Sequence, residues 1–89
     1  MTDRHAPPEI TIKADDDVAK ARFSNLAQVG STNDTIALDF CFVHGVTGWL
    51  LARILMSPAH AKRFHRVLGD TLARHEDAFG PIDEGPSVQ

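Results

Sequence analysis

The chain has 89 residues, 43% of them hydrophobic, with nine Lys and Arg, twelve Asp and Glu, and a formal net charge of −3. Folding a chain of this size removes only about 60% of the surface that the unfolded chain exposes, so a single copy would be marginally stable. One cysteine excludes an internal disulfide, and no His or Cys pair has zinc-site spacing. The acidic balance gives no reason to expect a polyanion as partner, and no apolar run approaches the roughly 18 residues of a membrane span. We therefore expect a small cytoplasmic protein with no membrane segment and no cofactor.

Proline-rich ends enclose one predicted domain. Residues 1–8 and 81–89 hold most of the prolines and show no apolar periodicity. Segments of this kind bury too little apolar surface to stay ordered, so both are predicted to be flexible tails. The first is also too polar for a signal peptide. Residues 9–80 remain as a single domain.

Four strands are predicted at the start of this domain. Residues 9–13 alternate, with Ile10 and Ile12 on one side, and end at an acidic turn over 15–17. Residues 21–29 form the second strand, which a turn over 30–34 closes. The third and fourth strands cover 35–43 and 49–56, joined by the loop 44–48.

The apolar pattern of the last two predicted strands indicates the register in which they pair. A hairpin symmetric about Val46 pairs apolar residues five times over, and it places Asp39 opposite Arg53. A slip of one residue would mix the two faces of the sheet. The predicted apolar pairs are Ile36–Met56, Leu38–Ile54, Phe40–Ala52, Phe42–Leu50 and Val43–Trp49.

A helix of about 22 residues follows directly. Ser57 suits the N-cap and Pro58 the first helical position. An apolar stripe with steps of three or four residues then runs to Gly80, through Ala61, Phe64, Leu68, Leu72, His75 and Phe79. The predicted fold is therefore α+β: a four-stranded antiparallel meander sheet followed by one long amphipathic helix, in the order ββββα.

One helix covers one face of such a sheet, and we expect it to cover the even-numbered face of residues 35–56. The other face is also largely apolar, which is unusual for a monomer in water. We expect a second copy to cover it, in a homodimer or larger homo-oligomer; the alternative is that the N-terminal strand or a tail folds across it. The expected interface residues are Asp39, Cys41, Trp49, Leu51, Arg53 and Leu55.

Four segments resemble a known family. They are Phe23-Ser24-Asn25, Leu38-Asp39-Phe40, the run 52–63 from Ala to Arg, and the ending 75–80. Over about residues 9–80 the chain resembles the small prokaryotic family catalogued as domain of unknown function 3467. Its members have no assigned activity, so the resemblance implies no catalytic residues. The chain departs from the family pattern on the helix, with His65 and Arg66 at usually apolar positions and His75 in place of Tyr.

Several polar residues are candidates for a chemical role. Asp39 and Arg53 either present a guanidinium to an anionic ligand or satisfy each other within a subunit interface, and the second role is favoured. The five histidines include no i, i+4 pair, which favours packed histidines over metal ligands, although a site that bridges two protomers stays open. Cys41 is expected to be a small buried hydrophobe. No nucleophile and base come together, so no enzyme is predicted.

The functional prediction is a non-enzymatic, self-associating binding or adaptor domain that engages another protein. The alternative is a single-stranded nucleic-acid-binding module, because four basic residues share the outer face of the helix. Acidic residues at 70, 76 and 77 interrupt that face and weaken this alternative. A ligand site between protomers comes third. The four basic residues are Lys62, Arg63, Arg66 and Arg74.

Overall fold

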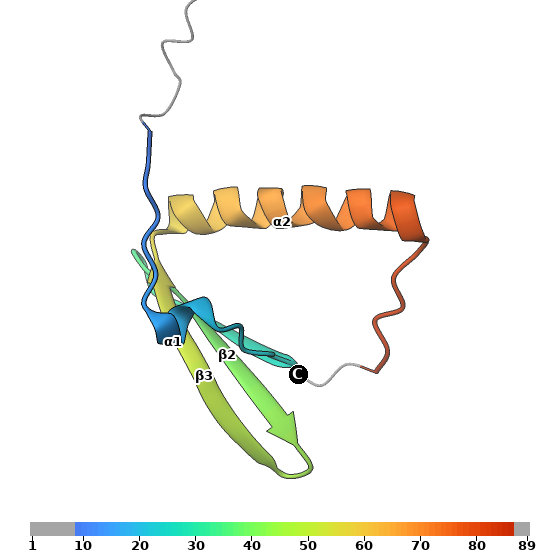
Figure 1. The fold of residues 1–89 in the computed structure, drawn as a ribbon, viewed down its shortest axis with the longest axis horizontal. Helices are drawn as coiled ribbons and strands as arrows, with labels where there is room; N and C mark the ends of the chain where they lie inside the picture. The colour runs from blue at the N-terminus through green and yellow to red at the C-terminus, as the bar shows by residue number, and fades with distance from the viewer. Residues whose placement is uncertain (1–8, 87–89) are drawn as a thin grey trace, which may run out of the picture.

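A computed structural model of the chain describes residues 9–86 and shows an α+β fold (Figure 1). A three-stranded antiparallel sheet in the order β1-β2-β3 is followed by a long C-terminal helix. The elements are α1 (Asp16–Ala19), β1 (Leu26–Ser31), β2 (Ile36–His44), β3 (Thr47–Met56) and α2 (Pro58–Phe79). The predicted tail over 1–8 and the last residues of the predicted tail over 81–89 lie outside the described residues.

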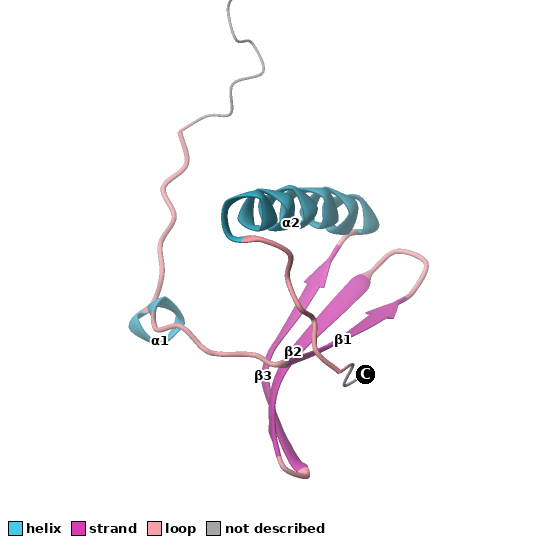
Figure 2. Ribbon diagram, turned by 90° about the vertical axis from the view of Figure 1, so that its right-hand side faces the viewer, coloured by secondary structure: helices cyan, strands magenta, loops and turns pink. Residues whose placement is uncertain are grey.

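The structure has three strands where the sequence predicts four. Residues 9–13 form no strand; they run as irregular chain away from the sheet (Figure 2). Strand backbone needs hydrogen-bonding partners, and no described segment lies beside these residues to supply them. The acidic stretch predicted as a turn begins the single-turn helix α1, where Asp16 and Asp17 suit the positive end of a helix.

The β2–β3 hairpin follows the predicted register for half its length. The pairs from Ile36–Met56 to Phe40–Ala52 are as expected, including Asp39 opposite Arg53. Beyond Phe40 the register shifts by one residue, so the predicted pairs Phe42–Leu50 and Val43–Trp49 are wrong. Phe42 instead lies opposite Trp49, and their rings stack with centroids 6.3 Å apart.

A tight turn explains this shift. The strands close over Gly45 and Val46 alone, in place of the predicted five-residue loop. Gly45 has a φ of 65°, as the first central residue of a type II′ turn requires. Since two residues span less chain than five, the extra residue of β3 is accommodated as a bulge at Leu51, which has no partner on β2.

Helix α2 has the predicted bounds and both predicted end signals. The Ser57 hydroxyl accepts a hydrogen bond from the His60 N–H at 3.1 Å, and Pro58 occupies the first turn. Gly80, with a φ of 95°, ends the helix and donates its N–H to the Glu76 carbonyl at 2.8 Å. With 22 residues, the helix is about 33 Å long.

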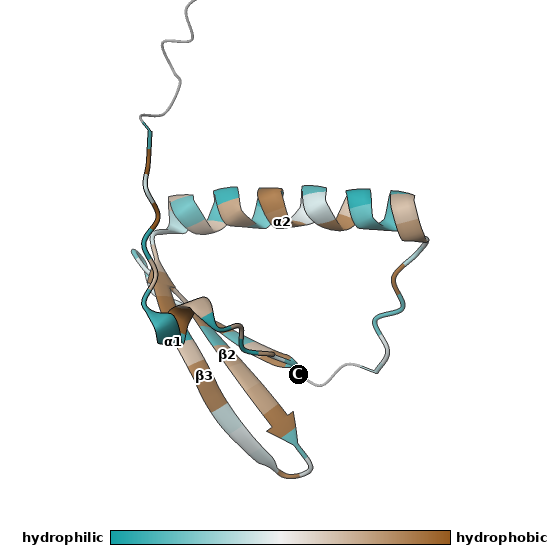
Figure 3. Ribbon diagram, viewed as in Figure 1, coloured by the Kyte–Doolittle hydropathy of each residue, from teal (hydrophilic) through white to brown (hydrophobic). Residues whose placement is uncertain are grey.

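The described residues contain no buried side chain. The apolar stripe of α2 is not covered by the sheet as expected: Phe64, Leu68 and Leu72 stay 40%, 45% and 45% exposed. Figure 1 shows why, because α2 diverges from the strands once it leaves the end of β3. Hydrophobic residues occur along both the strands and the helix (Figure 3), and many of their side chains stay exposed.

Whole-molecule dimensions agree with this open arrangement. The accessible surface is 8177 Å², whereas a compact folded chain of 9.7 kDa has about 5,100 Å². The Cα radius of gyration is 16.7 Å, against about 12 Å for a compact chain of this length. One copy of this chain therefore leaves its apolar faces without the second layer that a core requires.

Candidate functional site

The predicted polar pair lies at the centre of the sheet. Asp39 on β2 and Arg53 on β3 are direct cross-strand neighbours, so their side chains share one face. The Arg53 Nε–H donates to Asp39 Oδ1 at 2.8 Å, and its Nη2 donates to Oδ2 at 3.0 Å. This bidentate geometry is the strong form of an arginine–carboxylate pair.

The pair alters the pKa of both groups. The hydrogen bond from Arg53, and then its charge, hold the pKa of Asp39 below the ordinary aspartate value. The same hydrogen bond raises the pKa of Arg53, so the pair is ionised at neutral pH. Because Asp39 occupies two of the guanidinium donors, Arg53 keeps only its remaining N–H groups for a ligand.

A shallow hollow of about 410 Å³ adjoins the pair. It is lined by side chains from all three strands, because Gln28 on β1 lies opposite Asp39. Around it, Leu50 and Leu55 are 53% and 64% exposed. We call this side of the sheet the Asp39 face; by cross-strand register it carries Gln28, Ala37, Asp39, Cys41, Leu50, Arg53 and Leu55.

The bulge redistributes the six expected interface residues. Asp39, Cys41, Arg53 and Leu55 share the Asp39 face, as predicted. Trp49 does not, because its partner Phe42 lies on the opposite side of β2. Leu50 takes the place opposite Cys41. Strict alternation along β3 places Leu50 on the opposite face. The bulge at Leu51 moves the β3 residues that precede it by one position, so each of them faces the other side of the sheet.

Cysteine and histidine side chains make no metal centre in the described part of the chain, where no group of three possible ligands comes together. Cys41 is a free thiol that is half-buried on the Asp39 face, and not fully buried as expected. His75 packs against Phe79 with ring centroids 4.9 Å apart. His60 and His65 are exposed on α2.

The four predicted basic residues, Lys62, Arg63, Arg66 and Arg74, are all exposed on α2. Arg74 donates a hydrogen bond to the Thr71 hydroxyl at 3.3 Å, one turn earlier on the same helix. Their placement is compatible with a solvated helix face or with phosphate contacts. None of the described helices is long and apolar enough to cross a membrane.

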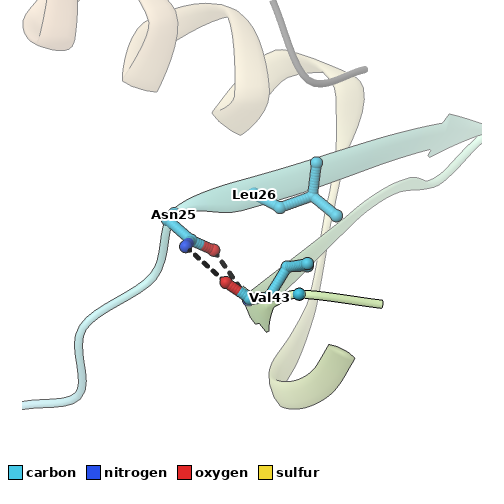
Figure 4. A pocket seen from close by; sticks show the side chains of 4 residues that line it. Asn25, Leu26 and Val43 are labelled. Carbon is cyan, nitrogen blue, oxygen red and sulfur yellow. Dashed lines mark hydrogen bonds between the residues drawn. The ribbon is translucent and has the colours of Figure 1, made fainter. Parts of the chain in front are cut away.

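Sequence reasoning gives no role to Asn25, which the structure places at a strand junction. Its side-chain amide donates to the Val43 carbonyl at 2.9 Å, and its carbonyl oxygen accepts from the Val43 N–H at 2.8 Å (Figure 4). Ser24 beside it donates to the Cys41 carbonyl at 2.9 Å. A hollow of about 290 Å³ lies here, lined by Asn25, Leu26, Val43 and Gly45. Since both polar ends of Asn25 already bind backbone, the residue extends the β1–β2 ladder.

Comparison with known proteins identifies one family. The sequence pattern of DUF3467, described as a protein of unknown function, matches residues 1–84. The chain belongs to this family. Neither the curated proteins nor the solved structures include a match to it. Four residues from the segments that carry the resemblance make hydrogen bonds within the fold: Ser24 and Asn25 beside the start of β1, Asp39 between β2 and β3, and Ser57 at the start of α2.

Proposed function

We propose that this DUF3467 chain is a non-enzymatic, self-associating binding or adaptor domain. It works in the cytoplasm of a prokaryotic cell, where it engages another protein. The observation that best supports self-association is the lack of a hydrophobic core among the described residues of a single copy. The accessible surface exceeds that of a compact 9.7 kDa protein by about 3,000 Å², and no described side chain is buried. A stable protein interface covers about 800 Å² on each partner, so the surplus is large enough for one.

Two apolar surfaces are available for this assembly. The first is the Asp39 face, where Leu50, Leu55 and Cys41 surround the ion pair. The second is the α2 stripe, where Phe64, Leu68 and Leu72 keep two fifths or more of their surface in water. Covering both at about 25 cal/mol per Å² would stabilise the assembly well beyond a single copy. The cytoplasmic setting rests on the lone cysteine, which gives no sign of a disulfide-forming compartment.

Sedimentation equilibrium between 1 and 50 μM tests self-association. We expect a mass that is a multiple of 9.7 kDa. As a matched pair, Leu55→Lys should lower the assembled fraction at least tenfold because it puts a charge on the apolar Asp39 face. Val46→Lys, in the exposed hairpin turn, should leave the fraction unchanged. A folded wild-type species of 9.7 kDa would remove the proposal.

The adaptor role is tested by the composition of the native complex. The protein is isolated from its own cell under mild conditions, and mass spectrometry measures the ratio of each polypeptide to it. A second polypeptide in whole-number ratio supports an adaptor. A homo-oligomer free of any stoichiometric partner contradicts that role and leaves self-association intact.

A nucleic-acid-binding module is the second candidate, favoured by the exposed basic residues of α2. A gel shift with mixed-sequence single-stranded DNA and RNA at about 20 mM salt separates it from the adaptor, since phosphate contacts must bind there and weaken as salt rises. We expect no shift, because the chain is acidic overall. A salt-sensitive shift that Arg63→Glu abolishes and Asp70→Asn retains would replace the adaptor proposal.

A further inference from the structure

The outer edge of β3 is open to another strand. The order β1-β2-β3 leaves this edge free, and no described residue hydrogen-bonds to it. Proteins usually protect long apolar edges with charges, prolines or a covering segment. β3 has ten residues, no proline and one charged residue, Arg53, which Asp39 engages from the neighbouring strand. Apart from the bulge at Leu51, the edge carries no such protection.

The N-terminal arm, residues 9–13, has the pattern of a strand without a partner. Its residues alternate between polar and β-branched apolar side chains, and Ile10 and Ile12 are 72% and 89% exposed. β-branched residues at alternate positions favour a pleated, half-buried strand. No hydrogen bond joins the arm to any other described residue. Both its backbone and its two isoleucines therefore lack the contacts that this pattern predicts.

The arm starts beside β3. Leu51, Ala52 and Ile54 of β3 line a hollow of about 550 Å³ together with residues 17, 18 and 20–22. From there the chain passes through α1 into the arm, which runs away from its own sheet in Figure 2. The arm is thus anchored on the side of the sheet that has the free β3 edge, and it extends to where a neighbouring molecule can meet it.

We propose that the N-terminal arm of one protomer adds as a strand to the outer edge of β3 in a second copy of the chain. The exchange gives each sheet its fourth strand and joins the two copies through backbone hydrogen bonds. It rests on the self-association proposed above. We infer that the occupant is a second copy, because each chain supplies one unpaired arm and one long free edge. In a dimer with a two-fold axis, each arm pairs with the β3 edge of the other chain, so the assembly is closed and no arm or β3 edge is left unpaired.

Proline substitution tests the backbone pairing. Successive N–H groups of a strand point to opposite sides, so either Thr11→Pro or Ile12→Pro removes a donor that faces β3. The arm makes no hydrogen bond to the other described residues of its own copy, so neither variant should disturb the protomer. We expect at least one of them to raise the Kd of self-association about tenfold. The matched controls Thr11→Val and Ile12→Val keep the N–H and should stay within twofold of wild type.

Cross-linking tests the location. In a Cys41→Ser background, a tagged chain with Thr11→Cys is mixed with an untagged chain with Ala52→Cys, and a short bis-maleimide is added. We expect a covalent product that contains one chain of each kind. Asn33→Cys, in the turn between β1 and β2, replaces Ala52→Cys as the control and should give little product.

The outcomes separate the two proposals. A wild-type monomer removes both of them. An oligomer that both proline variants leave intact, or that cross-links no better through Ala52→Cys than through Asn33→Cys, removes the arm exchange and retains self-association. As a further sample, a single chain carries both Thr11→Cys and Ala52→Cys; if cross-links form only within that chain, the arm belongs to its own β3 and the exchange is overturned.

Discussion

At the residue scale, the side chains that carry the family resemblance hold the scaffold together. Asn25 pairs with both backbone groups of Val43, and Ser57 caps α2. Asp39 and Arg53 fix the central register of the hairpin. Much of the hydrogen-bonding capacity of these side chains is used within the fold. The residues that carry the resemblance therefore indicate how the chain folds. They do not indicate which surface binds a partner.

The ion pair makes stability depend on pH with a definite sign. Asp39 has a lowered pKa in the folded state, so its contribution is present above the ordinary aspartate pKa of about 3.9 and is lost as pH falls through the lowered value. We expect the urea midpoint of wild type to fall more between pH 5 and pH 2 than that of Asp39→Asn. Asp70→Asn, on the exposed face of α2, should behave as wild type. Equal losses in wild type and Asp39→Asn would contradict this assignment.

At the element scale, local signals set the ends of α2 and a turn sets the faces of β3. The helix begins at Pro58 and ends at Phe79 because a cap and a glycine satisfy its terminal backbone groups. In the hairpin, the choice of a two-residue turn over a five-residue loop moves Trp49 from one face to the other. A shift of one residue in the register thus decides which large side chain lies opposite Phe42.

The cap is testable by a single substitution. Ser57→Ala removes the oxygen that accepts from the His60 N–H, and we expect a loss of about 1 kcal/mol in the free energy of unfolding. Ser57→Asp retains an acceptor and should lose much less. Urea unfolding followed by circular dichroism at 222 nm measures both at one protein concentration. An unchanged Ser57→Ala variant would show that the assembly, and not the cap, defines the start of the helix.

At the scale of the whole molecule, the sheet and the helix form two layers that do not close on each other. This divergence and the extended N-terminal arm both add to the accessible surface and to the radius of gyration. A layer architecture is stable only when its apolar faces meet, so folding and association are expected to be one process.

Coupled folding and association predict a concentration-dependent unfolding transition. Raising the protein concentration from 1 to 100 μM should move the urea midpoint upward by about 1 M, because mass action stabilises a dimer by RT ln 100. The measurement is a set of urea titrations at fixed temperature and pH. Leu55→Lys should unfold at a lower midpoint throughout. Coincident wild-type curves at all concentrations would assign the stability to the single chain.

The sequence by itself determined the ends of α2 and the pairing of residues 36–40 with residues 52–56, because end signals and matched apolar alternation cause these features. The range of α2 follows from Ser57, Pro58 and Gly80, and the Asp39–Arg53 register follows from matched apolar alternation. The resemblance to the DUF3467 family, carried by four segments of the sequence, is confirmed by the match over residues 1–84.

Only the tertiary structure decided how these elements combine. The bulge at Leu51 depends on a turn whose length the sequence leaves open, and it exchanged Trp49 for Leu50 on the Asp39 face. The strand predicted over 9–13 is irregular because strand pairing needs a neighbour, and no part of the described chain supplies one. The exposed stripe of α2 has the same cause: periodicity tells which side of a helix is apolar, but the path of the chain decides whether anything lies against it.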